Sequence, residues 1–147
     1  MQPLQFLVPV GALDAVERLL PFVIFGLVVA NMVTRALAHR SHERQAQNAD
    51  DGDLSRYLPH TLSTAALVVA SFLFTVVEPH GGIVLSVLVL GAFVSDFFEF
   101  EARQVEARND MTIERPKASL TVSVLVLLYA GYQALFFLIA PLWNAVV

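Results

Sequence analysis

Four long apolar stretches divide the 147-residue chain and constrain its fold more than any other feature. They cover residues 19–38, 61–77, 83–100 and 118–140. About 20 mostly apolar residues in a helix cross the roughly 30 Å hydrocarbon core of a bilayer. Each stretch is therefore long enough, or nearly long enough, to span a membrane. The sequence predicts an all-α integral membrane four-helix bundle that forms a single domain over residues 1–147.

The composition supports a lipid environment. The chain is 56% hydrophobic and 15% charged, whereas soluble domains average about 45–50% apolar and about 25% charged residues. The absence of cysteine excludes disulfides and thiolate metal sites. A net charge of −4 argues against nucleic acid as a partner. The expected partners are the lipid bilayer and other membrane subunits or further copies of the chain.

Proline positions mark the predicted helix ends. Pro59 and Pro116 stand where the second and fourth helices begin, a position that tolerates proline. The segment 78–82, Glu-Pro-His-Gly-Gly, is typical of a tight turn. The second and third helices should therefore form an antiparallel hairpin.

Pro21 leaves two possibilities for the first helix. Asp14 and Glu17 have the spacing of a capping box, which marks a helix start. Either one helix runs from Asp14 with a kink at Pro21, or a short interfacial helix over residues 14–20 precedes the span. The single kinked helix is slightly preferred.

The distribution of Lys and Arg predicts the orientation. Eight of the nine basic residues lie in or next to the connections 39–57 and 101–117, and only Arg18 lies on the opposite side. Because basic residues concentrate on the cytoplasmic side, both connections are predicted to be cytoplasmic in a multi-pass protein of the cell membrane, with both termini outside. Residues 101–109 have helical charge spacing, so the third helix should continue for about two turns beyond its span.

A polar stripe runs along the second helix. At 100° per residue its members share one face; they are His60, Thr64, Ser71, Thr75 and Glu78. One interpretation is a hydrated path for protons or small cations. The other is an interhelical seam of hydrogen-bonded hydroxyls. The seam is favoured because proton relays generally carry a charge at mid-membrane and this stripe has none.

Charged residues inside the spans predict an intramembrane ion pair. Asp96 and Glu99 lie near the end of the third span, and a carboxylate inside a membrane helix is usually paired or functional. Arg35 lies at a similar depth on the first helix. We therefore predict that Arg35 pairs with Asp96 or Glu99, the alternative being solvation of all three at the headgroup level.

Other polar residues offer further candidates. His39, His42 and His60 could form a weak nitrogen and oxygen metal site, although exposed interfacial histidines are the commoner arrangement. Asn31 and Gln133 lie deep in their spans and require hydrogen-bond partners there. Tyr129 and Tyr132 could border a quinone or lipid, but structural tyrosines are more common. No cofactor can be assigned from the sequence.

The charged residues also carry a resemblance. Arginine outnumbers lysine eight to one, and the connections are acidic. With the stretches Pro3-Leu4-Gln5-Phe6-Leu7-Val8-Pro9 and Asp96-Phe97-Phe98-Glu99-Phe100-Glu101, this balance resembles small four-span membrane proteins of uncharacterised function from halophilic archaea. That resemblance implies no activity and no functional residues.

The sequence contains no nucleotide-binding, zinc-protease or nucleophile-elbow motif. The expected function is therefore that of a non-catalytic accessory or assembly subunit of a membrane complex. Two alternatives remain: a small proton or cation transporter that uses the polar stripe, and a quinone- or metal-binding component of a redox complex.

Overall fold

The computed structural model describes residues 10–48, 54–109, 111 and 117–146. Four helices follow one another in this part of the chain: α1 (Val10–Asn48), α2 (Leu58–Val77), α3 (Pro79–Arg108) and α4 (Lys117–Val146). Each contains one predicted apolar stretch, and all four are long and apolar enough to cross a membrane. The described residues include no strand, so the all-α prediction is confirmed.

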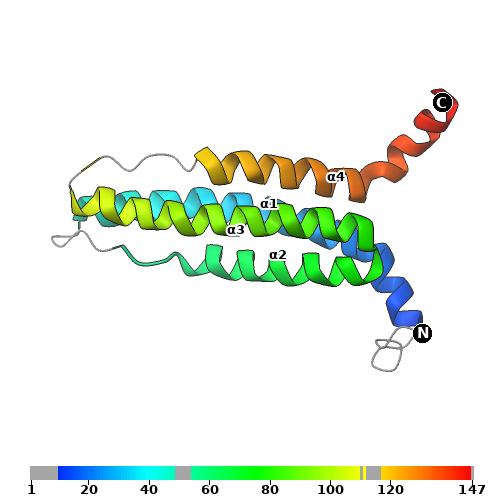
Figure 1. Ribbon diagram of the computed structural model, residues 1–147, viewed down its shortest axis with the longest axis horizontal. Coiled ribbons are helices and arrows are strands. Elements are labelled where there is room, and N and C mark those ends of the chain that lie inside the picture. The colour runs from blue at the N-terminus through cyan, green and yellow to red at the C-terminus, as the bar shows by residue number, and fades with distance from the viewer. Residues whose placement is uncertain (1–9, 49–53, 110, 112–116, 147) are drawn as a thin grey trace.

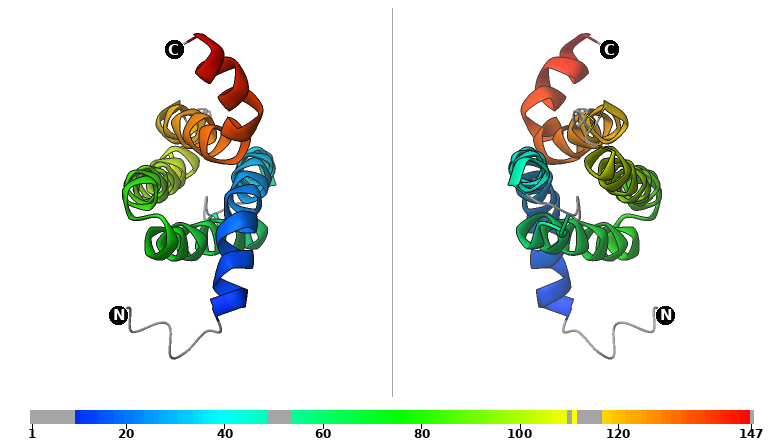
Figure 2. Two further views of the ribbon diagram at one scale, coloured as in Figure 1. Left: turned by 90° about the vertical axis from the view of Figure 1, so that its right-hand side faces the viewer. Right: turned by 90° about the vertical axis from the view of Figure 1, so that its left-hand side faces the viewer.

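The helices form a closed ring. α1 packs against α2, α2 against α3 and α3 against α4, and α4 packs back against α1. The end-on views in Figure 2 show the four helices around a common interior. α1 and α3 therefore stand diagonally opposite each other. The C-terminal ends of α1 and α3 lie at the same end of the bundle as the N-terminal ends of α2 and α4 (Figure 1).

The hairpin between α2 and α3 is tighter than predicted. α3 begins at Pro79 rather than Ile83, and Glu78 caps both helices. The reason is that proline suits a first helical turn, where its missing N–H would have no intrahelical partner. The Gly82 N–H donates to the Glu78 carbonyl at 2.7 Å. Pro59 lies in the first turn of α2 as predicted, and Pro116 lies outside the described residues.

Two helices continue through a proline. α1 runs unbroken through Pro21, so residues 14–20 are not a separate helix. It also extends to Asn48, so much of the predicted connection 39–57 is helical, and α3 continues to Arg108 as predicted. α4 contains Pro141, and Figure 1 shows its last part leaving the bundle. Such a bend is expected because proline removes one helical hydrogen bond and its ring clashes with the preceding turn.

Apolar side chains occupy both the interior and the outside of the bundle. Ile24, Val28, Leu85, Val89 and Val126 are buried in the central core. The outward faces carry many more exposed large apolar side chains. Contiguous apolar surface of this extent is rare on a soluble monomer. The four candidate spans and this outer surface indicate a multi-pass membrane protein.

Candidate functional site

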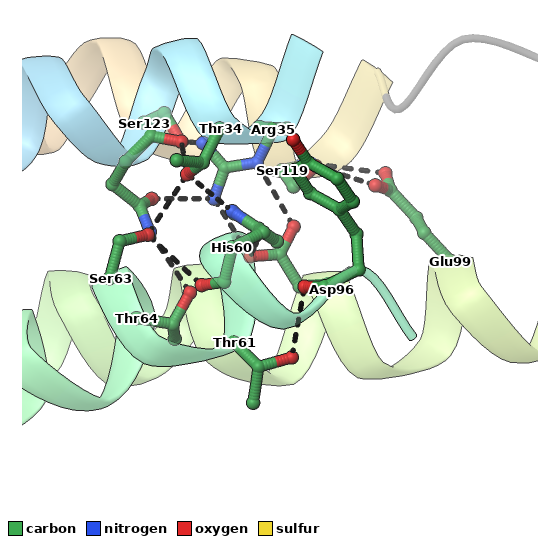
Figure 3. Close-up of polar contacts among 12 residues, drawn as sticks. Thr34, Arg35, His60, Thr61, Ser63, Thr64, Asp96, Glu99, Ser119 and Ser123 are labelled. Atoms are coloured by element: carbon green, nitrogen blue, oxygen red, sulfur yellow. Dashed lines mark hydrogen bonds and ion pairs between the residues drawn. The ribbon is translucent and has the colours of Figure 1, made fainter. Parts of the chain in front are cut away.

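Polar side chains from all four helices meet at one level of the bundle (Figure 3). We call this set the polar layer. Its members are Asn31, Thr34 and Arg35 of α1, His60, Ser63 and Thr64 of α2, Asp96 of α3 and Ser123 of α4. It lies toward the end of the bundle where α1 and α3 end.

An ion pair between Arg35 and Asp96 crosses the interior of the ring. The Arg35 Nε donates to Asp96 Oδ1 at 3.0 Å, and Nη2 donates to Oδ2 at 2.8 Å. Two parallel hydrogen bonds of this kind are the strongest geometry for an arginine and a carboxylate. Only 1% of the Arg35 surface is exposed. The pair therefore joins two diagonally opposed helices in a low-dielectric environment.

The Arg35 guanidinium also donates hydrogen bonds to side chains of α1 and α4. Nη2 donates to Asn31 Oδ1 at 3.0 Å, one turn earlier on α1. Nη1 donates to the Ser123 hydroxyl on α4. An unsatisfied buried donor costs about 1–3 kcal/mol, so these bonds lower the cost of placing a guanidinium inside the bundle.

His60 and its neighbours connect α2 to the same network. The His60 Nε2 donates to Asp96 Oδ2 at 3.1 Å, since a carboxylate can only accept. Its Nδ1 lies 2.9 Å from the Thr34 hydroxyl. The Asn31 amide donates to Ser63 at 3.0 Å and to Thr64 at 2.9 Å. All four helices therefore contribute to one hydrogen-bonded unit.

Glu99 contacts α4 rather than Arg35. Its carboxylate accepts the Ser119 backbone N–H at 3.1 Å and the Ser119 hydroxyl at 2.5 Å. Ser119 lies in the first turn of α4, where backbone N–H groups lack intrahelical acceptors and a negative charge is stabilised by the helix dipole. Glu99 therefore fixes the start of α4 against α3.

Neutralising Glu99 should weaken this attachment. We expect Glu99→Gln to lower the free energy of unfolding by about 1 kcal/mol, because the amide still accepts a hydrogen bond but the charge at the helix terminus is lost. For a chain of this size that is a drop of about 2–4 °C in the thermal unfolding midpoint. Glu101→Gln, which changes an exposed carboxylate two residues later, should have no effect. Equal drops for the two variants would contradict the assignment.

A second buried arginine lies beyond the polar layer. The Arg103 Nη1 donates to His42 Nδ1 at 3.1 Å, and His42 Nε2 donates to the Ser55 carbonyl at 3.1 Å. His42 is therefore in the tautomer that carries its hydrogen on Nε2. The Arg103 Nε is buried and has no hydrogen-bond partner. Nearby, the Arg56 guanidinium lies 4.3 Å from the centre of the Phe100 ring.

The three histidines proposed as weak metal ligands have separate partners. His39 Nε2 lies 2.9 Å from Glu43, His42 contacts Arg103, and His60 contacts Asp96. Across the described ranges, no three His, Asp or Glu side chains are grouped so as to hold a metal ion.

The polar stripe of α2 consists of two groups of residues with different hydrogen-bond partners. His60 and Thr64 join the polar layer, whereas Ser71 and Thr75 bond within α2 and Thr75 also bonds Ser86 of α3 at 3.0 Å. Buried Leu67 and Ala70 separate these two groups. Glu78 is exposed at the hairpin.

Gln133, the other deep polar residue, donates to the Tyr129 hydroxyl at 3.1 Å, one turn earlier on α4. Its side chain also lies close to Gly81 of the hairpin, where a Cβ would come within 2.7 Å of Gln133 Nε2. Gln133 therefore packs against the turn between α2 and α3.

Several members of the polar layer were not predicted, namely Thr34, Ser63 and Ser123. The helical spacing of polar residues in the sequence could have identified Thr34 and Ser63. Residues 31, 34 and 35 share one face of α1, and residues 60, 63 and 64 share one face of α2. Two polar triplets with the same i, i+3, i+4 spacing and at similar depth would have indicated facing surfaces.

A ring of four membrane-length helices joined by a buried ion pair defines the structural class. Residues 2–147 match a protein family described as Domain of unknown function (DUF7313), and the chain belongs to this family. No curated protein and no solved structure matches the chain.

Proposed function

We propose that this chain is a non-catalytic accessory or assembly subunit that joins a larger membrane complex or a homo-oligomer. One observation carries the proposal. The end of α4 leaves the bundle (Figure 1) while remaining apolar, with Leu142, Trp143 and Val146 all more than half exposed. A helix end that departs from its own bundle in this way presents a surface to a neighbouring membrane protein.

The polar layer gives the proposed subunit a rigid frame. Arg35 bonds to three other residues, and those residues lie on α1, α3 and α4. Buried polar groups that are satisfied in this way can fix the register of packed helices. The layer supports a structural role, because its donors and acceptors are engaged with one another.

The proposed orientation places the C-terminal ends of α1 and α3 on the cytoplasmic side. These ends and the starts of α2 and α4 carry most of the basic residues, and positive charge favours the cytoplasm. The connections 39–57 and 101–117 would then be cytoplasmic and both termini would lie outside. Trp143 would lie at the outer interface, where indole rings are enriched.

Photo-crosslinking in native membranes tests the subunit proposal. A photoreactive amino acid in place of Trp143 should give one discrete protein adduct, which mass spectrometry identifies as a partner or a second copy. The matched control is the same substitution at Leu125, an exposed residue of α4 within the bundle, which should give lipid adducts. Only lipid adducts at both positions, together with a monomer after mild extraction, would refute the proposal.

A further inference from the structure

Arg103 is a buried cation with fewer hydrogen-bond partners than its guanidinium has donors. It is 7% exposed, and its one hydrogen bond to a described residue goes to the neutral His42 ring. Its Nε is buried without a partner. The negative charges of Glu99, Asp96 and Glu106 act on Arg103, but none of these carboxylates forms a hydrogen bond or direct ion pair with its guanidinium. Burying an unpaired charge is strongly unfavourable, so this environment points to an anionic ligand.

Arg103 lines a small pocket beside the polar layer, which we call the arginine pocket. The pocket has a volume of about 40 Å³. Its charged and titratable lining residues are Arg35, Arg56, Arg103, His42, His60, Asp96 and Tyr57. The single carboxylate is already bonded to Arg35 and His60. Three guanidinium groups against one engaged carboxylate leave the pocket positively charged.

A larger cavity adjoins the arginine pocket on the outer side of α2 and α3, and we call it the phenylalanine groove. It has a volume of about 300 Å³ and shares Arg56, His60, Thr61 and Asp96 with the arginine pocket. Its apolar walls are Phe93 and Phe97, each nearly half exposed. The two cavities therefore combine a positively charged inner end with an apolar outer end.

The depth of these cavities matches that of lipid headgroups. Arg56 lies just before α2 enters its apolar stretch, and Phe97 lies near the end of the apolar stretch of α3. The Arg56 guanidinium lies 5.5 Å from the Phe97 ring centre and 4.3 Å from that of Phe100, at the junction of the two cavities. Basic residues between transmembrane helices at this level are typical of sites for anionic headgroups.

We propose that the arginine pocket and the phenylalanine groove together bind one anionic membrane lipid. The phosphate lies between Arg56 and Arg103, and a hydrocarbon chain lies along Phe93 and Phe97. Guanidinium groups suit this role because their donors match the oxygens of a phosphate. The bound lipid supplies the direct anionic partner that the nearby carboxylates do not give Arg103. This site is independent of the partner proposed for α4.

Thermal unfolding of the delipidated full-length chain in detergent tests this site. Phosphatidylglycerol at about a hundred times its dissociation constant should raise the unfolding midpoint by about 5–10 °C. Phosphatidylcholine, which has a phosphate but no net charge, should raise it much less. Native mass spectrometry should show one phosphatidylglycerol retained per chain. Equal stabilisation by the two lipids would overturn the proposal.

Three variants separate the site from general surface charge. Arg103→Gln and Arg56→Gln should each weaken phosphatidylglycerol binding at least fivefold. Arg44→Gln, which removes an exposed arginine of α1 that lines neither cavity, should bind normally. Without lipid, Arg103→Gln should unfold no earlier than the parent chain, because it removes a buried unpaired charge. If Arg103→Gln does not fold, phosphatidylglycerol binding by Arg56→Gln decides the outcome, because Arg56 is exposed and its substitution leaves the core intact.

Inorganic phosphate distinguishes the source of the anion. At millimolar concentration it should leave the midpoint unchanged, because it lacks the chain that occupies the phenylalanine groove. Stabilisation by phosphate equal to that by phosphatidylglycerol would overturn the lipid assignment and indicate a soluble anion. Normal phosphatidylglycerol binding by both Arg56→Gln and Arg103→Gln would overturn the site itself.

Discussion

Arg35→Met should lower the free energy of unfolding by about 3–5 kcal/mol, the cost of leaving one partner of a buried ion pair alone. Methionine retains the unbranched apolar stem of the side chain without the guanidinium group, so the effect reports the charge and its hydrogen bonds more than lost packing of the stem. Removal of Arg35 leaves Asp96 and Asn31 without their main donor and Ser123 without a partner. Circular dichroism of unfolding in mixed micelles measures the loss.

A double-mutant cycle separates the pair from the single substitutions. Asp96→Leu alone should also be strongly destabilising, because it leaves Arg35 buried and uncompensated. The double variant should be more stable than the sum of the two losses predicts, with a coupling energy toward the upper end of the usual range of about 0.5–3 kcal/mol. Arg40→Met, at an exposed position of the same helix, should have no measurable effect. Strictly additive losses would show that Arg35 and Asp96 do not interact.

The helices could be predicted from the sequence because length and apolarity alone define a span. The region 61–77 was predicted to be helical, and α2 covers Leu58–Val77. Helix ends were less predictable, because they depend on local packing. α3 begins at Pro79, directly after Glu78. This short connection is possible because Gly82 has no side chain and can lie against the backbone of α2.

The ion pair could be anticipated only in part. Depth along a helix follows from counting residues, and it placed Arg35 level with both Asp96 and Glu99. The choice between the two carboxylates depends on which helix faces which, and a single sequence does not record this. The ring order puts α3 diagonal to α1, where Asp96 faces Arg35, whereas Glu99 turns toward the start of α4.

The contacts around Arg103 could not be predicted from the sequence, because they join three separate segments of the chain. The Arg103 side chain reaches His42 of α1, which in turn reaches Ser55 in the segment before α2. The arginine pocket exists only where these segments converge. Its lining residues come from positions 35 to 103 of the chain. Arg56 and Arg103, each taken alone, have the pattern of an ordinary solvated charge at the end of a membrane helix.

Gly82→Ala should destabilise the chain by about 3 kcal/mol or more, at or above the upper end of the usual cost of overpacking. A Cβ at this position would lie 2.1 Å from the Thr75 Cα and 2.4 Å from its backbone nitrogen. Rotation of a side chain cannot relieve an overlap with backbone, so α2 and α3 would have to separate. Separation would also break the bond between Thr75 and Ser86.

Gly26→Ala is the matched control, because a Cβ at Gly26 would meet no atom within 4 Å. Both glycines lie in helices, and alanine is the better helix former by about 1 kcal/mol. Gly26→Ala should therefore unfold at the same temperature as the parent chain or slightly higher, whereas Gly82→Ala should unfold several degrees lower or fail to accumulate. Comparable midpoints for the two variants would mean that α2 and α3 do not approach each other closely at Gly82, because helix propensity acts in the same direction at both positions.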